Sequence, residues 1–212
     1  MDAEVFRAWI VSAAGLIEAN RDHLTQLDAA IGDADHGINL ARGFTAVLGA
    51  FEAAATPAAT PGAILTMTGN TLISKVGGAS GPLYGTAFRR AGKALGDAAD
   101  VDLPALSAAL DAALAGVQQL GAAREGDKTM VDALAAATRA FGKAIAEGAS
   151  QDDALSVLAE AASAGAEATV SMQALKGRAS YLGPRSVGHE DPGAVSTALI
   201  LGALRDAAQA GR

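Results

Sequence analysis

The stretch LDAAIGDADHGINLARGF, from Leu27 to Phe44, separates two segments whose apolar residues have the spacing of helices. In the preceding segment, 4–25, the apolar positions are Phe6, Trp9, Ile10, Ala13 and Ile17. In the following segment they are Ile38, Phe44, Val47, Leu48 and Phe51. Residues recurring at this spacing share one face of a helix, so we expect two amphipathic helices joined by a polar turn.

The rest of the chain repeats this alternation of helical segments and breakers, and we expect eight helices in all. Pro57 and Pro61 are the stop and start signals of the loop after the second helix. The later helices are expected over about 62–75, 82–96 and 104–121, then from a cap at Asp127 or Thr129 to about 148, from Ser150 or Asp153 to about 176, and from HEDPG to the end of the chain.

Composition favours an all-α protein that forms one domain over residues 1–212. Aromatic residues are only 4% of the chain, which suits closely packed helices better than a β-sandwich. A net charge of -7 argues against a nucleic-acid partner, because no basic stripe is present. Without cysteines, a basic leader or an apolar run of about 20 residues, we expect a soluble, cytoplasmic protein with no membrane partner.

Four of the interruptions contain most of the glycine, aspartate, histidine and asparagine clusters: 32–39, 77–82, 126–130 and 177–193. They follow the first, third, fifth and seventh expected helices. If successive helices run in opposite directions, all four loops lie at the same end of the bundle. The other connections are ordinary polar turns, so we expect one end of an antiparallel, up-and-down eight-helix barrel to be a binding site.

Three carboxylates lie close together in the first loop, at Asp28, Asp33 and Asp35. Such a group repels itself unless a cation relieves the charge. All-oxygen ligands favour a hard ion, and Mg²⁺ completed by phosphate oxygens fits better than an EF-hand Ca²⁺ site, because no glutamate follows at the twelfth position. The alternative is that the three aspartates are separate helix caps and turn formers. His36 and Asn39 stand where a helix start favours phosphate.

The remaining loops supply groups suited to a phosphate ligand. VGGASGP offers small residues and the Ser80 hydroxyl, but it is not a Walker A loop. GRASYLGPRSVGHEDPGA supplies Arg178, Arg185, His189 and Asp191. An arginine there can neutralise a transferred phosphoryl group, or it can be a surface ion pair. Met130 can line a base pocket, although a core position is the simpler interpretation.

Four motifs, IGDADHGINLARG, VGGASGPLYG, GDKTM and GRASYLGPRSVGHEDPGA, in this order across the chain, resemble the L subunits of dihydroxyacetone kinases. The resemblance implies an eight-helix barrel that binds ADP or ATP at one end through two Mg²⁺ ions held by Asp28, Asp33 and Asp35. It also implies catalytic roles for His36 and Arg178. The nucleotide contacts it implies are His36, Gly37, Ile38, Asn39, Ala79, Ser80, Gly121, Thr129, Met130, Arg178, Asp191, Pro192 and Gly193.

The resemblance further implies that the chain acts with a K subunit, which holds the ketose covalently through a histidine. A phosphotransferase-system M subunit is the expected donor to a retained ADP, and a transcriptional regulator is a further expected partner. Three alternatives stay open: an ATP-dependent kinase subunit for another small ketose, the nucleotide domain of another kinase of this fold such as a fatty-acid kinase, and a nucleotide-sensing regulatory module.

Overall fold

The computed structural model describes residues 1–54 and 58–211, and within these ranges every regular element is a helix. Pro57, one of the expected loop signals, lies outside the described residues. The α-helices are α1 (Ala3–Ala19), α2 (Arg21–Ile31), α3 (His36–Ala53), α4 (Pro61–Lys75), α5 (Ser80–Leu95), α6 (Leu103–Gly121), α7 (Met130–Ala146), α8 (Gln151–Ala168) and α9 (Pro192–Ala210). Two 3-10 helices, η1 (Thr169–Ser171) and η2 (Arg178–Ser186), lie between α8 and α9.

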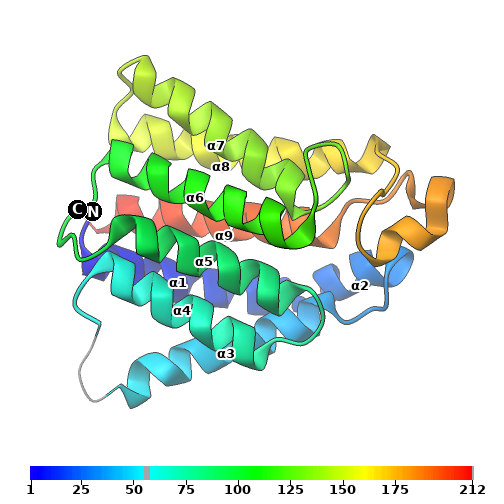
Figure 1. Ribbon diagram of the computed structural model, residues 1–212, viewed down its shortest axis with the longest axis horizontal. Helices are drawn as coiled ribbons and strands as arrows, with labels where there is room; N and C mark the ends of the chain where they lie inside the picture. Colours follow the sequence, from blue (N-terminus) through cyan, green and yellow to red (C-terminus); the bar gives the residue numbers. More distant parts are fainter. Residues whose placement is uncertain (55–57, 212) are drawn as a thin grey trace.

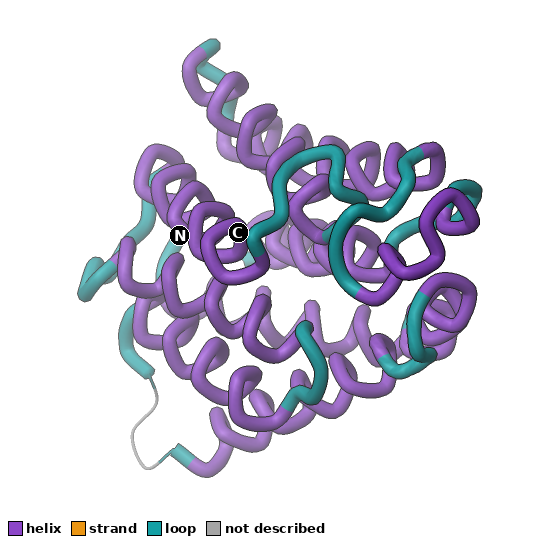
Figure 2. Tube along the Cα trace, turned by 45° about the vertical axis from the view of Figure 1, so that its right-hand side comes forward, coloured by secondary structure: helices purple, strands orange, loops and turns teal. Residues whose placement is uncertain are grey.

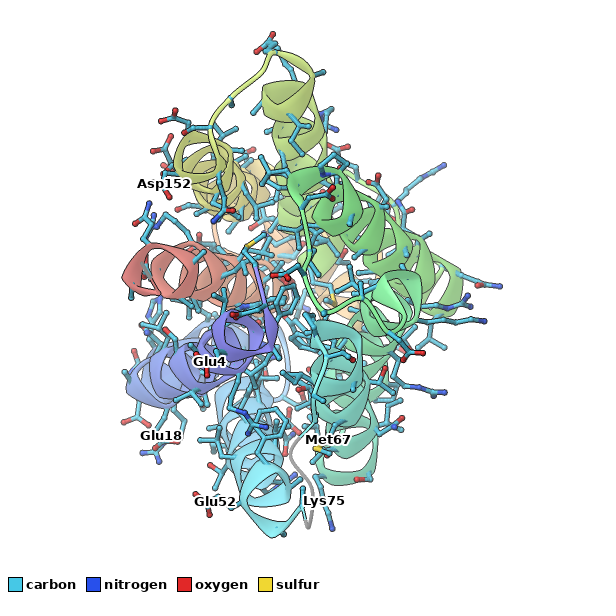
Figure 3. The ribbon with its side chains drawn as sticks, turned by 90° about the vertical axis from the view of Figure 1, so that its left-hand side faces the viewer. Glu4, Glu18, Glu52, Met67, Lys75 and Asp152 are labelled. Atoms are coloured by element: carbon cyan, nitrogen blue, oxygen red, sulfur yellow. The ribbon has the colours of Figure 1, made fainter. Side chains whose placement is uncertain are left out.

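The α-helices form a closed ring. From α3 to α9 each helix packs against the next, and α9 closes the ring against α1, which also packs against α3 (Figures 1 and 2). Seen along the helix axes, the helices surround an interior filled with side chains (Figure 3). Counting α1 and α2 as one bent member, the ring has eight members, so the predicted all-α barrel is confirmed.

Aromatic residues from several helices meet in the core despite their low number. The Trp9 ring lies 5.7 Å from that of Phe6 and 5.8 Å from that of Phe88, and Phe44 packs edge-on against Phe88. The Trp9 indole N–H donates to the carbonyl of Ile200 at 2.7 Å, which fastens α1 to α9. All five apolar positions predicted for the first helix are buried.

The first predicted helix, 4–25, is wrong in one respect, because it is divided at Asn20 and continues to Ile31. The Asn20 amide donates to the carbonyl of Leu16 at 2.8 Å, and its backbone leaves the helical region. Asparagine competes in this way for backbone groups inside helices. The added turns of α2 bring Asp28 to the end of the barrel.

The seventh predicted helix is also too long. It begins as expected after the Ser150 cap, but α8 ends at Ala168 instead of near residue 176. The segment expected to be an irregular loop, 177–193, contains η2. The carbonyl of Thr169, just after the end of α8, accepts a hydrogen bond from the buried ammonium of Lys128 at 2.7 Å. A long-range partner of this kind is invisible to local sequence patterns.

Between the predicted caps of α7, the structure selects Thr129. The Thr129 hydroxyl accepts from the backbone N–H of Val131, and Asp132 accepts from the backbone N–H of Thr129, which forms a capping box. Asp127 instead accepts from the backbone of Arg124. Among the described residues, no helix is long and apolar enough to span a bilayer.

Candidate active site

The four loops singled out from the sequence meet at one end of the barrel, opposite the end where both termini lie (Figure 1). They enclose a cavity of 390 Å³. Its walls come from the α2–α3 loop, the start of α5, the start of α7, the residues before and in η2, and the start of α9. A larger groove of 1040 Å³ runs between α4 and α5, but none of the three aspartates lines it. The smaller cavity therefore holds the candidate site.

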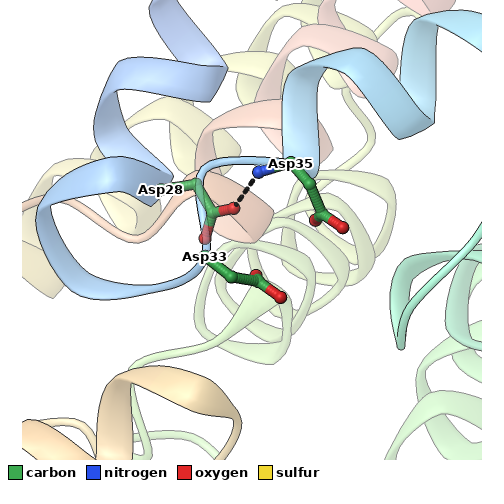
Figure 4. A group of neighbouring side chains, drawn as sticks. All are labelled: Asp28, Asp33 and Asp35. Carbon is green, nitrogen blue, oxygen red and sulfur yellow. Dashed lines mark hydrogen bonds between the residues drawn. The ribbon is translucent and has the colours of Figure 1, made fainter.

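The three aspartates converge in this cavity. One carboxylate oxygen from each of Asp28, Asp33 and Asp35 lies within 4.8 Å of the others (Figure 4). Asp28 comes from the last turns of α2, whereas the other two follow in the connection to α3. Ala34, between them, has a φ of 62°, a left-handed conformation that costs a non-glycine residue about 1–2 kcal/mol. The backbone of the turn is therefore strained at Ala34, between the two carboxylates that it brings to Asp28.

The Asp28 side chain organises this turn. Its Oδ2 accepts the backbone N–H group of Asp35 at 2.8 Å (Figure 4). The same oxygen accepts the backbone N–H group of His36 at 3.1 Å. Its other oxygen, Oδ1, lies on the side of Gly32, where a Cβ would stand 2.0 Å from it. Gly32 therefore has to be glycine for the turn to close over the carboxylate. One oxygen of Asp28 shapes the backbone and the second remains for a ligand.

The helix-cap interpretation of the three aspartates does not hold for the side chain of Asp35. Asp35 occupies the N-cap position of α3, yet its side chain makes no capping hydrogen bond. Three carboxylates so close together, with the Asp28 side chain buried, fit a hard divalent ion by the chemistry of their oxygens. The carboxylate of Asp35 therefore stays available to an ion, whereas Asp28 uses one oxygen for the backbone and has the other available.

Arg178 faces the same cluster from η2. Its guanidinium lies 3.1 Å from Oδ2 of Asp33, and its side chain is 71% exposed. An exposed pair of this kind contributes little to stability. Arg178 is therefore placed to exchange its carboxylate partner for another anion in the cavity. Arg185 and His189, in the same loop segment, do not line the cavity.

His36 lies at the base of the cavity, only 8% exposed. Its Nδ1 is 3.1 Å from the Ser80 hydroxyl and its Nε2 is 2.9 Å from the Ser196 hydroxyl. Burial lowers the pKa of His36 more than the charges of Asp28 and Asp35 raise it, which favours the neutral ring. With both ring nitrogens occupied, His36 connects α3, α5 and α9.

The start of α9 closes the far side of the cavity with Asp191, Pro192 and Gly193. The Asp191 carboxylate caps α9 by accepting the backbone N–H of Ala194 at 2.8 Å. Its burial raises its pKa to about 7, despite that hydrogen bond and the nearby Lys128 ammonium. Thr129 and Met130, Ala79 and Ser80 also line the cavity.

Four of the residues assigned by resemblance do not line the cavity, namely Gly37, Ile38, Asn39 and Gly121. A Cβ on Gly37 would lie 2.0 Å from the carbonyl of Arg21, so close packing of α3 on α2 accounts for this glycine. Ile38 is half exposed. The Asn39 amide oxygen accepts from Arg42 at 2.7 Å, and Gly121 ends α6 beside Leu83. Their assigned contacts stay predictions.

Sequence reasoning missed Lys128 and Tyr84, although both lie inside quoted motifs. Lys128 is buried, with a φ of 60°, and its ammonium donates to the carbonyls of Thr169 and His189. It thereby joins the loop before α7 to the loop before α9. A lysine is expected on the surface, so no sequence signal marks it as buried.

A family model and the most similar known proteins indicate the same family for this chain. The model of the DAK2 domain matches residues 30–206. The chain is 41% identical over 201 residues to the "PEP-dependent dihydroxyacetone kinase, ADP-binding subunit DhaL" of Escherichia coli, covering 95% of both chains. It is 40% identical over 196 residues to the ADP-binding subunit DhaL of PEP-dependent dihydroxyacetone kinase 1 of Listeria innocua, covering 92% of both chains.

Longer proteins also contain a similar segment. The triokinase/FMN cyclase of Rattus norvegicus is 40% identical over 188 residues, which are 89% of this chain and 32% of that protein. Among solved structures, the dihydroxyacetone kinase of C. freundii in complex with AMP-PNP and Mg²⁺ superposes with a TM-score of 0.73 at 29% identity. This chain spans about a third of that kinase, 34%, while 97% of this chain is covered.

Proposed function

The chain belongs to the DAK2 domain family, and we propose that it is the nucleotide-binding subunit of a dihydroxyacetone kinase, which binds ADP or ATP with Mg²⁺ in the four-loop cavity. The observation that carries this proposal is the group of three carboxylates within 4.8 Å at the cavity wall. Its oxygens suit Mg²⁺, and the surrounding loops offer an arginine, hydroxyls and helix starts to a phosphate chain. The AMP-PNP and Mg²⁺ in the related kinase agree with such a site.

Asp28, Asp33 and Asp35 would hold the metal, as two Mg²⁺ ions in the form that the resemblance implies. When bound, Mg²⁺ neutralises charge on the phosphate oxygens. Arg178 would leave Asp33, its partner at 3.1 Å, and bind the transferred phosphoryl group. Because phosphoryl transfer needs little covalent chemistry from the protein, these residues act by positioning and by neutralising charge.

The remaining assignments follow the cavity walls. Thr129 and Met130 at the start of α7 would contact the base, and Asp191, Pro192 and Gly193 the remaining edge of the nucleotide. Ala79 and Ser80 would contact the phosphates or the ribose. His36, which lies beneath them with both ring nitrogens occupied, would support the phosphate side without transferring a proton.

The phosphoryl acceptor would be dihydroxyacetone held by a separate K subunit. In the transfer, the bond between the γ-phosphorus and the bridging oxygen would break with its electron pair leaving on ADP, a bond to the ketose hydroxyl oxygen would form, and the proton of that hydroxyl would pass to water. Exposed apolar side chains in η2 and directly beside it support docking of a partner there. They are Leu175, Val187 and Tyr181, the last of which is 87% exposed. Isolated exposed apolar side chains are common, but a group beside a binding site is typical of an interface.

Two sources of the phosphoryl group are compatible with this cavity. The ADP-binding DhaL relatives, named as PEP- or PTS-dependent, favour an ADP that stays bound and is rephosphorylated by a phosphotransferase-system M subunit. The similar segment in triokinases favours an exchanging ATP and, with it, an ATP-dependent kinase for another small ketose. We favour the retained ADP, because the match covers 92% and 95% of the two DhaL relatives.

A direct experiment separates these two sources. The purified protein is dialysed extensively in Mg²⁺ buffer, denatured by heat, and the released nucleotide is identified by chromatography. Near-stoichiometric ADP supports the retained cofactor. A protein that is empty, yet binds ATP when it is added back, supports exchange. A protein that is empty and binds neither ADP nor ATP with Mg²⁺ contradicts the proposed function.

A further inference from the structure

Lys128 is buried at the edge of the cavity, although lysine side chains rarely are. It is 1% exposed and belongs to the short connection before α7. Its amine donates to two backbone carbonyls, that of Thr169 at 2.7 Å and that of His189. A carbonyl only accepts, and an ammonium group and a neutral amine both offer at least two N–H donors. The direction of both bonds is therefore the same in either protonation state.

The two carbonyls lie near opposite ends of one segment of the cavity wall. We call residues 169–191 the wall segment, which contains η1 and η2 and runs from the end of α8 to the N-cap of α9. It carries Arg178, which lies against the aspartates, and it ends at Asp191, which caps α9. A single side chain thus ties both ends of the segment that supplies two of the expected nucleotide contacts.

The wall segment has few other attachments to the barrel. Among the described residues, its members are absent from the main hydrophobic core and join only a small cluster with Ile31 of α2. Lys128 and Asp33 are the only described side chains outside the segment that form hydrogen bonds or ion pairs with it, and the Asp33 pair with Arg178 is exposed. An exposed ion pair contributes little stability. The two bonds of Lys128 are therefore the main side-chain attachment of this segment.

We propose that Lys128 is a positioning residue that fastens the wall segment to the start of α7 and so holds Arg178 and Asp191 in place before a nucleotide arrives. Without its two bonds the segment would leave its place while the barrel stays folded, because local opening occurs where buried apolar contacts are few. Nucleotide would then bind only to the molecules whose wall segment is in place. The nucleotide part of the inference rests on the proposed function, but the fastening does not.

Hydrogen exchange tests the fastening in the protein without nucleotide. Lys128→Met keeps the length of the side chain and removes its N–H donors. We expect the amides of the wall segment to exchange about twentyfold faster in this variant, because each of the two lost bonds is worth about a factor of five. The backbone N–H groups of Leu175 and Gly188, which are hydrogen-bonded in the structure, are the reporters. Amides in α1, α4 and α5 should exchange as in the wild type.

Lys93→Met is the matched control, because Lys93 is an exposed lysine on α5 away from the cavity, and its exchange should equal that of the wild type. Unchanged exchange in a folded Lys128→Met would overturn the proposal, as would faster exchange throughout the barrel. Lys128→Gln keeps two N–H donors on a shorter side chain, and its exchange decides if only this variant folds. Loss of helical circular dichroism in both Lys128 variants would also overturn the proposal, because the whole barrel would then require the lysine.

Nucleotide binding distinguishes positioning from a merely structural role. In Mg²⁺, we expect Lys128→Met to bind ADP about fivefold more weakly, which corresponds to a wall segment in place about a fifth of the time. Saturating Mg-ADP should return the exchange of the wall segment to that of the liganded wild type, which damage to the fold would not do. Unchanged ADP binding, or exchange that stays fast at saturation, would overturn the positioning role. A wild type that binds no ADP would overturn the proposed function and leave the exchange result in the free protein standing.

Discussion

Asp35 is the residue for which the choice between helix cap and metal ligand has the clearest test. It holds the N-cap position of α3 without capping it. We expect Asp35→Asn to lose Mg²⁺-dependent nucleotide binding by at least tenfold and phosphoryl transfer with it, because the amide removes one negative ligand from the cluster. Calorimetric titration of ADP in Mg²⁺ measures the loss.

The matched control for Asp35 is Asp111→Asn, an exposed aspartate in the middle of α6. It makes the same change of charge away from the cavity and should bind Mg-ADP like the wild type. Equal weakening in both variants would mean that the net charge of the protein matters, and full activity of Asp35→Asn with a K partner would remove Asp35 from the metal ligands.

Arg178 is expected to matter for transfer and little for folding. Its only ion pair in the described structure is the exposed contact with Asp33, so Arg178→Ala should change the free energy of unfolding by about 0.5 kcal/mol or less. Its rate of phosphoryl transfer should fall by two or more orders of magnitude, as for arginines that neutralise a transferred phosphoryl group. Urea denaturation and a coupled assay with the K partner measure the two effects. A variant that loses stability and helical circular dichroism together would mark Arg178 as structural.

Asp191 gives the protein a pH dependence of defined sign. Its pKa is raised from 3.8 to about 7 by burial, so the folded protein binds a proton there more readily than the unfolded chain does. The contribution of Asp191 to stability is therefore greatest below about pH 4 and is lost as the pH rises to about 7. Two charged groups also shift the pKa of Asp191: the Asp132 carboxylate raises it and the Lys128 ammonium lowers it.

Asp191→Asn isolates this effect, because asparagine also caps helices. The free energy of unfolding of wild type minus that of the variant should decrease from about pH 4 through pH 7 and be level above about pH 8. Urea denaturation of the nucleotide-free proteins across this range measures it. A difference that is constant with pH, or that increases, would contradict the raised pKa.

At the scale of elements, the helices could be predicted from periodicity and caps, whereas their breaks could not. The apolar positions at 3.6-residue spacing in α1 are buried, and the caps at Ser150 and Thr129 lie where the sequence indicates. The division at Asn20 depends on one side-chain bond to the backbone, and the early end of α8 coincides with a contact from Lys128. Local patterns do not contain such contacts.

In the candidate site too, local sequence patterns predict some residues, and long-range packing determines the others. The aspartates, Arg178 and the four loops could be predicted, because glycine, aspartate and histidine clusters stand out in an alanine-rich chain. Lys128 and Tyr84 could not, since their roles depend on which elements pack together. Gly37 packs α3 closely against α2, and its contact with the nucleotide stays a prediction.

The capping box of α7 provides a prediction at this scale. Thr129→Ala removes the hydroxyl that accepts from Val131, and we expect the free energy of unfolding to fall by about 1 kcal/mol. Thr129→Ser keeps the hydroxyl and should retain most of the stability. Urea denaturation compares the three proteins. If Ser and Ala variants are equally destabilised, the methyl group of Thr129 is what matters, and the cap is not.

For the whole molecule, the closed ring explains how residues far apart in sequence form one cavity. Because α9 closes against α1, the start of α9 is brought beside the α2–α3 loop and the start of α5. Alternating helices carry the polar connections to one end, and the termini lie at the other (Figure 1).

The central claim is that Mg²⁺ and nucleotide bind together in this cavity, and one titration tests it. The protein is stripped with EDTA, and ADP binding is followed by calorimetry with Mg²⁺ and with EDTA. We predict one site per chain that binds ADP in Mg²⁺ and binds it at least a hundredfold more weakly in EDTA. Equal affinity under the two conditions would contradict the account, because the three carboxylates would then have no part in holding the nucleotide.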